Sequence, residues 1–477
     1  MWRGRPFQGS DAGDLAIVLH SHMPYVEGFG TYPFGEEWLF DAVIRSYLPV
    51  LEVADRVTMT ITPVLADQLE DEGVQERLRR FLIDWRIGAA ETEISAGEVA
   101  PECLDACEGE LARYRHALEL LDADGGSPLR SFRRASEEGR IALAASSATH
   151  AVLPLLATRQ GLGLQLDAGI RSHRRRFGWD GGFWLPECAY VPGLEWRLAE
   201  QGVTWFCVDQ SRHGKPLDAL SPVATEAGPV ALPIDWEAIQ WLWSLDGYPS
   251  DPAHAQFAGE SLRGIRIWKV GGGGYDPAAA EVAARRQAGE FLAAVEARLR
   301  EFAATSNRRG LLVFAIDTEL LGHWWSEGTI WLREVIAAAE GRGVRLLTAP
   351  EALAEHEPVE RLLSASTWGE DKDLRTWDSP AVADIAWGAR RLELRLLRAL
   401  RSGLRGDAAS RATRELLAAQ ASDWAFLDKR GQAGDYAFQR ATSHSEAALE
   451  AIDSPAIADP RMRALAPDLS LSPLLQP

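Results

Sequence analysis

The feature that most constrains the fold is a series of short apolar runs separated by stretches of helical character. Near-continuous apolar strands that alternate with helices are typical of a parallel sheet covered on both faces. Seven such runs favour a barrel over an open sheet, and two weaker runs at 229–234 and 265–270 leave the strand count open. The seven runs lie at 15–19, 57–62, 141–145, 182–185, 203–208, 311–316 and 344–348.

Two regions interrupt this alternation. Residues 66–138 are rich in helix-forming sequence and contain no good strand, so we interpret them as a helical insertion between two barrel strands. From about residue 380 the pattern is again helical to near the end of the chain. We therefore expect a barrel built from residues 10–65 and 139–355, the insertion at 66–138, and a C-terminal helical domain at 380–465.

Charge and composition exclude several classes of partner. Acidic residues outnumber basic residues by 69 to 50, so a chain with formal charge −19 repels phosphate backbones and nucleic acid is not expected as a partner. The apolar runs have the length of strands, and we expect no membrane association. The N-terminal residues 1–14 have no apolar run typical of a signal peptide, and four cysteines imply no disulfide scaffold. These features favour a cytoplasmic protein.

The tryptophan content is unusual, since 18 tryptophans outnumber 15 phenylalanines and 8 tyrosines. Tryptophan offers a large flat apolar face with one N–H donor. An excess of it is typical of a groove lined by aromatic rings. The alternative interpretation is that a large core uses the same side chains for packing.

Ionisable side chains follow five of the seven runs, at the points where the runs end. In parallel barrels these C-terminal strand ends meet at one rim, which is where active sites lie. The residues are His20, His22, His150, Glu187, Asp209 and Asp317. We therefore expect these side chains to come together in one site.

Glu187 and Asp317 are the candidate catalytic residues within this set. Both lie among aromatic residues, where burial disfavours the charged form of a carboxyl group and raises its pKa. Two carboxyl groups in different environments are the usual means of cleaving a glycosidic bond. The alternative is a structural carboxylate bonded to backbone or arginine. The placement of both groups at strand ends favours catalysis.

His20 and His22 are two residues apart, so they project to one side of an extended segment. They could form half of a metal site completed by aspartate or a third histidine. They could equally donate hydrogen bonds to sugar hydroxyls and orient a carboxylate. The histidine pair alone would also allow a metal-dependent, deacetylase-like barrel.

Six separated motifs resemble those of glycoside hydrolase family 57, and within it the glucan branching enzymes. The similarity extends to SDWAF at 422–426, in the C-terminal helices. The motifs are LHSHMPYV (19–26), FGEEWLFDAV (34–43), SATH (147–150), WLPECAY (184–190), FAIDTELLGHWWSEG (314–328) and STWGEDKDLRTW (366–377). The resemblance implies an incomplete, seven-stranded (β/α) barrel with a helical insertion and a C-terminal helical domain. It also implies a retaining reaction on α-1,4-glucans without metal or other cofactor.

The resemblance assigns a role to each candidate. Glu187 matches the nucleophile of the family and Asp317 its general acid/base, while His20, His22 and His150 match histidines that line the reaction subsite. A further set of residues is expected to contact glucan. They are Trp268, Trp324, Trp377, Asp423 and Trp424.

One segment departs from the family pattern. The branching enzymes carry a long tyrosine-bearing loop over the active site, whereas residues 213–233 are short here and contain no tyrosine. That loop is thought to shield the glycosyl-enzyme from water, because transfer and hydrolysis share one intermediate. The sequence therefore predicts a branching enzyme with substantial hydrolysis. The alternatives are an amylase-type α-glucan hydrolase and an inactive glucan-binding protein.

Overall fold

The structure, a computed structural model, describes residues 11–28, 35–97, 99–261, 263–454 and 464–476. Most of the segment considered above for a signal peptide lies outside these residues. The strands are β1 (Gly13–Ser21), β2 (Val57–Ile61), β3 (Ile141–Ser146), β4 (Gly182–Trp184), β5 (Trp205–Val208), β6 (Val223–Ala224), β7 (Val230–Pro233), β8 (Leu311–Asp317), β9 (Val344–Leu346) and β10 (Val359–Glu360).

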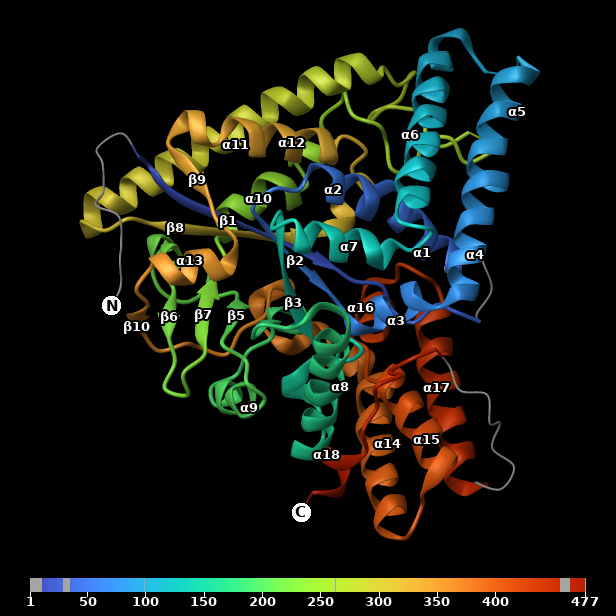
Figure 1. Cartoon of the computed structure of the whole chain (residues 1–477), viewed down its shortest axis with the longest axis vertical. Helices are drawn as coiled ribbons and strands as arrows, with labels where there is room; N and C mark the ends of the chain where they lie inside the picture. Colours follow the sequence, from blue (N-terminus) through green and yellow to red (C-terminus); the bar gives the residue numbers. More distant parts are fainter. Residues whose placement is uncertain (1–10, 29–34, 98, 262, 455–463, 477) are drawn as a thin grey trace.

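The helices surround this sheet (Figure 1). They are α1 (Glu36–Ala42), α2 (Leu48–Val53), α3 (Pro63–Glu70), α4 (Glu72–Arg80), α5 (Gly88–Ala96), α6 (Leu104–Ala123), α7 (Pro128–Glu137), α8 (Arg159–Phe177), α9 (Leu194–Glu200), α10 (Trp236–Trp243), α11 (Pro277–Ser306), α12 (Gly328–Ala338), α13 (Ala349–Glu355), α14 (Ala383–Arg401), α15 (Gly406–Ala419), α16 (Ser422–Arg430), α17 (Tyr436–Asp453) and α18 (Ser472–Leu475). In the described part of the chain, no helix combines the length and apolar character needed to cross a bilayer.

Seven parallel strands form an incomplete barrel. They lie side by side in the order β7, β5, β4, β3, β2, β1 and β8. Among the described residues, β7 and β8 at the two ends of this series share no strand pairing. The backbone N–H of Asp235, just after β7, donates to the carbonyl of Val313 in β8 at 2.8 Å, which brings the open edges together. The predicted fold class is confirmed.

Each of the seven predicted runs contains a strand, but the barrel uses a different set. β9, from the run at 344–348, pairs with the N-terminal end of β1 and lies off the main strand order. The weaker run at 229–234 supplies β7, the seventh barrel strand. The prediction of a strand at 265–270 is wrong, because that segment makes only isolated bridges. Positive φ angles at Gly271–Gly273 turn the chain back on itself there.

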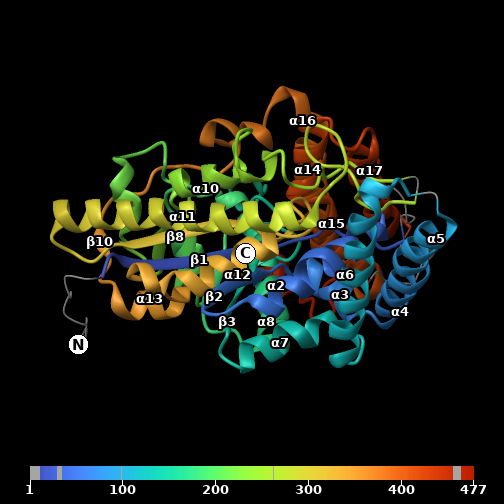
Figure 2. The same cartoon turned by 90° about the horizontal axis from the view of Figure 1, so that it is seen from above.

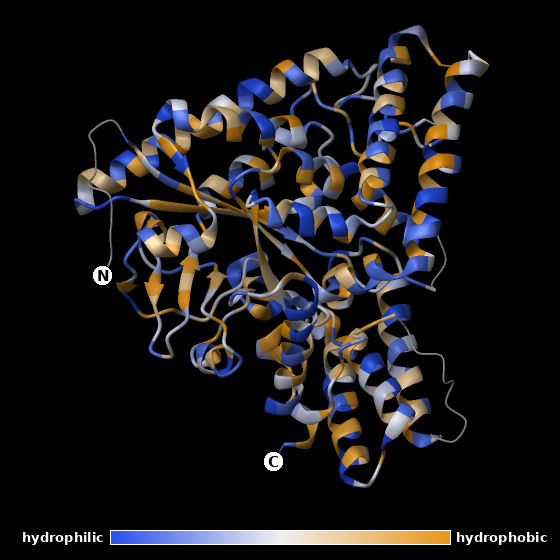
Figure 3. Ribbon diagram, viewed as in Figure 1, coloured by the Kyte–Doolittle hydropathy of each residue, from blue (hydrophilic) through white to orange (hydrophobic). Residues whose placement is uncertain are grey.

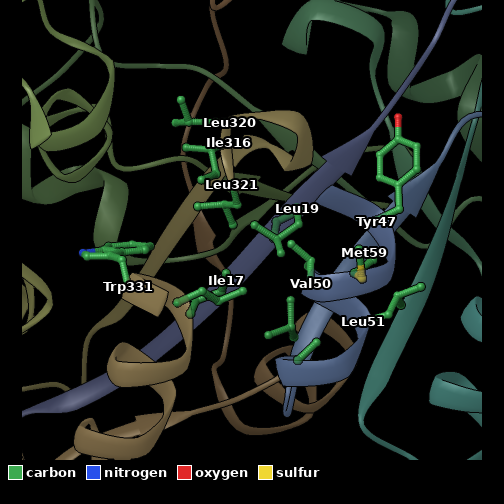
Figure 4. Packing of buried hydrophobic residues seen from close by; sticks show 14 of the residues in the cluster. Ile17, Leu19, Tyr47, Val50, Leu51, Met59, Ile316, Leu320, Leu321 and Trp331 are labelled. Atoms are coloured by element: carbon green, nitrogen blue, oxygen red, sulfur yellow. The ribbon is translucent and has the colours of Figure 1, made fainter. Parts of the chain in front are cut away.

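The barrel core follows directly from the apolar runs (Figure 3). All nine residues of β1 are buried, as expected for a central parallel strand with both faces covered. Figure 4 shows Ile17 and Leu19 of β1 close to Val50 of α2, Met59 of β2 and other members of the same buried cluster. The rigid sheet therefore fixes the positions of the residues that follow each strand.

The C-terminal helices pack against the barrel beside α8 and α3 (Figure 1). Leu396 and Leu416 of α14 and α15 share a buried cluster with Val64 and Leu164 from the barrel side. Figure 2, seen from above, also places α16 and α17 at this end of the molecule, away from the start of β1. This packing brings the first residues of α16 to the C-terminal ends of the strands.

Candidate active site

Five of the six predicted residues at the strand ends come together, whereas the sixth, Asp209, contacts Ser211 and Lys372. His20 lies next to Asp317 in the register of β1 and β8, and next to Thr60 in that of β1 and β2. His150 follows β3 and Glu187 follows β4. The start of α16 completes the site from the C-terminal helices, since Ser422 and Asp423 contact these residues.

The carboxylate of Glu187 is oriented by one donor on each oxygen. The indole N–H of Trp368 donates to Oε2 at 2.9 Å, and the hydroxyl of Ser422 donates to Oε1 at 2.8 Å. Glu187 lies in a 3₁₀ turn (Pro186–Cys188) with φ 61°, a left-handed conformation that glutamate rarely adopts. Such local strain persists only where the surroundings enforce it, and it clusters at functional sites. The fold therefore presents this carboxylate in one defined direction.

Burial raises the pKa of Glu187 to about 7, against the lowering effect of the hydrogen bonds from Trp368 and Ser422. The two donors stabilise the ionised form that a nucleophile requires. A carboxylate that is ionised but poorly solvated is a stronger nucleophile than one in water.

Asp317 ends β8 in an environment that favours its protonated form. Burial raises its pKa well above the ordinary range, and the negative charges of Glu319, Glu187 and Asp423 raise it further. The ionised form of Glu187 therefore favours the protonated form of Asp317. Protonated Asp317 can donate a proton, whereas Glu187 is held for attack, which is the division of roles that glycoside cleavage needs.

The rings of three histidines stack beside the carboxyl groups, and two of these histidines are hydrogen-bonded to each other. Nε2 of His20 lies 2.9 Å from Nε2 of His150, and the rings of His22 and His150 stack with centroids 4.1 Å apart. Burial holds the pKa values of His20 and His150 well below the ordinary range, so both are neutral. Burial also lowers the pKa of His22, but the charge and hydrogen bond of Asp423, 2.9 Å away, together with the charges of Glu319 and Glu187, make the net shift upward.

His22, His150 and Asp423 carry ligand atoms within 4.8 Å of one another, which is close enough to test as a metal site. The rings of His22 and His150 stack with an interplanar angle of 26°, so their in-plane lone pairs do not converge on one point. Both ring nitrogens of His22 are already bonded, Nδ1 to Thr62 and Nε2 to Asp423. The arrangement therefore does not fit a metal centre, and contact of these histidines with sugar hydroxyls stays a prediction.

A metal analysis tests this interpretation. We expect the purified protein to contain far less than one zinc per chain, and chelator treatment to leave its activity unchanged. Elemental analysis of the protein before and after dialysis against chelator makes the measurement. Stoichiometric zinc whose removal abolishes activity would instead support the metal-dependent alternative.

Three residues of the site were not among the sequence candidates. Trp368 and Ser422 hold Glu187, and Glu319 accepts hydrogen bonds from the backbone N–H of His22 at 2.9 Å and from the hydroxyl of Tyr47. Burial raises the pKa of Glu319 to about 7. Each lies inside a quoted motif, and Glu319 also lies two residues after the end of β8, but strand-end position indicates neither Trp368 nor Ser422. Only their contacts across the fold identify them.

The predicted aromatic residues lie in different environments. Trp268 is 37% exposed in the loop before α11, and Trp324 is partly buried with its ring centroid 6.0 Å from that of Trp243. Trp377 is only 2% exposed, and Trp424 is fully buried, with its indole N–H donating to the carbonyl of Ala418. The structure gives Trp377 and Trp424 packing roles, and glucan contact by any of the four stays a prediction.

An incomplete barrel with two carboxyl groups at its rim defines the class of glycoside-cleaving enzymes. The model of glycosyl hydrolase family 57 matches residues 16–365. A second model, described as the C-terminal part of 1,4-alpha-glucan branching enzyme, matches residues 389–466. The chain belongs to glycosyl hydrolase family 57.

Curated relatives match over nearly the whole chain. A 1,4-alpha-glucan branching enzyme of Thermococcus kodakarensis is 31% identical over 491 residues, covering 91% of this chain and 72% of the relative. A probable 1,4-alpha-glucan branching enzyme of Mycobacterium tuberculosis strain H37Rv is 32% identical over 494 residues, covering 92% of this chain and 91% of the relative.

Solved structures agree with this placement. The family 57 branching enzyme of Pyrococcus horikoshii superposes with a TM-score of 0.91 at 28% identity, covering 98% of this chain and 97% of that chain. The α-amylase AmyC of Thermotoga maritima superposes with a TM-score of 0.83 at 25% identity, covering 93% of this chain and 94% of that chain. Because the Pyrococcus horikoshii structure matches 98% of this chain, the match extends to the C-terminal helices, which supply Ser422 and Asp423.

Proposed function

We propose that the chain is a retaining 1,4-α-glucan branching enzyme, which cleaves α-1,4 linkages and forms α-1,6 linkages. The observation that carries the proposal is the environment of the two carboxyl groups: Glu187 is oriented by donors on both oxygens, and Asp317 is held protonated beside it. The names of the curated relatives and the matched C-terminal model support branching as the outcome.

In the first step, the Glu187 carboxylate attacks the anomeric carbon and the bond to the leaving oxygen breaks. Asp317 donates its proton to that oxygen, so the shortened glucan leaves as a neutral alcohol. The donor glycosyl group then remains on Glu187 as an ester. Neutral His20 and His150 add no charge beside the developing oxocarbenium ion, and their ring nitrogens bond to Thr60, to Ser422 and to each other.

In the second step, the oxygen of an incoming hydroxyl attacks the anomeric carbon, and the ester bond breaks to return the Glu187 carboxylate, while ionised Asp317 accepts the proton of that hydroxyl. A glucan 6-hydroxyl gives a branch, and water gives hydrolysis. Residues 213–233, which contain no tyrosine, fold into a 3₁₀ turn (Pro216–Leu220) and the β6–β7 hairpin. We therefore propose substantial hydrolysis beside transfer.

An α-glucan hydrolase of the amylase type is the second candidate. The superposition on the Thermotoga maritima α-amylase and the short 213–233 segment favour it. A glucan-binding protein without catalysis is the third candidate, but it has no use for two carboxyl groups in such different environments. The three candidates differ in the products they form from a linear glucan.

Product analysis on amylose is the test. We expect new α-1,6 linkages together with a measurable release of reducing ends, because water competes for the glycosyl-enzyme. Debranching followed by chain counting measures the linkages, and a reducing-sugar assay measures hydrolysis. Reducing ends without α-1,6 linkages would establish the hydrolase. Branches without release of reducing ends would contradict the proposal that the short 213–233 segment leads to substantial hydrolysis.

We also propose an α-glucan as the partner and the cytoplasm as the location. The four cysteines are all buried and unpaired, which supports a reducing compartment.

The division into a catalytic barrel (10–65 and 139–355), a helical insertion (66–138) and a C-terminal helical domain (380–465) is likewise a proposal. It is supported by α4–α7 within the insertion and by α14–α17 in the C-terminal part.

A further inference from the structure

Asp209 is an ionisable residue at the rim that the proposed reaction does not use. It follows β5 and its side chain is fully buried. Its Oδ1 accepts hydrogen bonds from the backbone N–H of Ser211 at 2.8 Å and from its hydroxyl at 2.6 Å. Its Oδ2 accepts from Nζ of Lys372 at 2.9 Å. A buried carboxylate needs such a cationic partner, because removing the cation leaves an uncompensated charge.

Lys372 is held by more than this ion pair. Its Nζ lies 2.8 Å from the ring centroid of Trp236, at the start of α10, and 3.4 Å from the carbonyl oxygen of Trp368. The side chain is 15% exposed. Carboxylate, aromatic face and carbonyl thus surround the ammonium group, so its position is defined by three separate elements of the fold.

The segment that carries Lys372 also carries the donor to Glu187. Trp368 donates from its backbone N–H to the carbonyl of Glu187 and from its indole N–H to Oε2, both at 2.9 Å. Between Trp368 and Lys372 the chain makes a tight turn, in which the backbone N–H of Lys372 donates to the carbonyl of Gly369 at 3.1 Å. Asp371 and Lys372 both have positive φ, 58° and 57°. A turn strained at two non-glycine residues needs outside contacts to persist.

We propose that Lys372 and Asp209 form a positioning pair for the nucleophile. The ion pair anchors the 368–372 turn to the end of β5, and the turn holds the indole of Trp368 against Oε2 of Glu187. This inference rests on the proposed function in taking Glu187 as the nucleophile. Neither Lys372 nor Asp209 touches substrate in this scheme, and both act through Trp368.

The effect of the pair is measurable because the Trp368 bond stabilises ionised Glu187. Loss of a hydrogen bond to the charged form raises a carboxyl pKa. The substitution changes none of the other groups that face Glu187: Nδ1 of His150 at 3.6 Å, the hydroxyl of Ser422, the charges of His22 and Asp423, and the protonated carboxyl group of Asp317. On the acid side of the plot of kcat against pH, the rate falls as Glu187 becomes protonated. A shift of this acid limb therefore reports loss of the Trp368 hydrogen bond.

The experiment measures kcat and KM on amylose against pH for Lys372→Met, with Lys429→Met on the exposed face of α16 as the matched control. We expect Lys372→Met to lower kcat by about ten- to a hundredfold, with a smaller change in KM. We expect its acid limb to move up by about one pH unit. Trp368→Phe, which keeps a ring but lacks the N–H, should move the limb in the same direction. Lys429→Met should match the parent enzyme.

A double-mutant cycle and a folding check complete the test. Asp209→Asn should act in the same direction as Lys372→Met, and the double variant should be little worse than either single one. Should Lys372→Met not fold, the double variant Lys372→Met/Asp209→Asn, which leaves no unpaired buried charge, carries the same measurement. A folded Lys372 variant with the parent kcat and acid limb would overturn the positioning role, even with Glu187→Gln inactive. An active Glu187→Gln would instead overturn the proposed function.

Discussion

Glu187→Gln is expected to lose turnover on amylose by about four orders of magnitude or more, equivalent to about 5 kcal/mol of barrier. The amide cannot attack the anomeric carbon, so no glycosyl-enzyme forms. The variant should still fold, because the amide can place its oxygen toward the indole N–H of Trp368 and its NH₂ toward the hydroxyl oxygen of Ser422. Initial rates on amylose make the measurement.

The control is the melting temperature, which should stay close to that of the parent. A second variant, Glu187→Ala, separates chemistry from binding. It opens space where the carboxylate stood, and azide should restore cleavage of a substrate with a good leaving group by attacking from that side. Near-normal turnover in folded Glu187→Gln would place the nucleophile elsewhere.

The strands were predictable from the sequence because parallel barrel strands are buried on both faces and appear as continuous apolar runs. The run at 311–316 is β8 within one residue at its end. The apolar runs could not show that β7 rather than β9 is the seventh barrel strand. Both strands are short, and membership of the barrel depends on pairing, since β7 pairs with β5 whereas β9 pairs with the start of β1. At 265–270 the apolar residues pack a loop, and the glycines that follow reverse the chain.

The site was predictable as far as it depends on strand ends. Glu187, Asp317 and the three histidines follow strands, and parallel topology brings such positions to one rim. Trp368 and Ser422 come from segments more distant in sequence that reach the rim through tertiary packing. Nothing in their local pattern indicates a contact with Glu187.

The tryptophan excess was a weaker guide. Trp184, Trp325, Trp331 and Trp424 are among the largest fully buried side chains, so much of the excess serves the core. Composition counts aromatic rings but does not locate them. The packing interpretation therefore holds for these four tryptophans, and the groove interpretation stays a prediction.

Asp317→Asn is expected to lower turnover on amylose by about 10²- to 10⁴-fold, the usual loss when a general acid/base is removed. The amide cannot protonate the departing glucan oxygen. The alkaline limb of the rate profile should disappear as well, because burial and the charges of Glu319 and Glu187 hold the pKa of Asp317 high, and its deprotonation ends acid catalysis as pH rises. The measurement is kcat/KM against pH for the variant and its parent.

A glucosyl fluoride distinguishes this loss from a general disruption of the site. Fluoride leaves without a proton, so Asp317→Asn should form the glycosyl-enzyme from it and then stall, since activation of the incoming hydroxyl needs the same residue as a base. Mass spectrometry should detect the trapped ester on Glu187. Glu319→Gln is the matched control, because Glu319 is a buried carboxyl nearby that accepts from the N–H of His22 and the hydroxyl of Tyr47. If Glu319→Gln stalls on the fluoride and Asp317→Asn does not, the acid/base is Glu319.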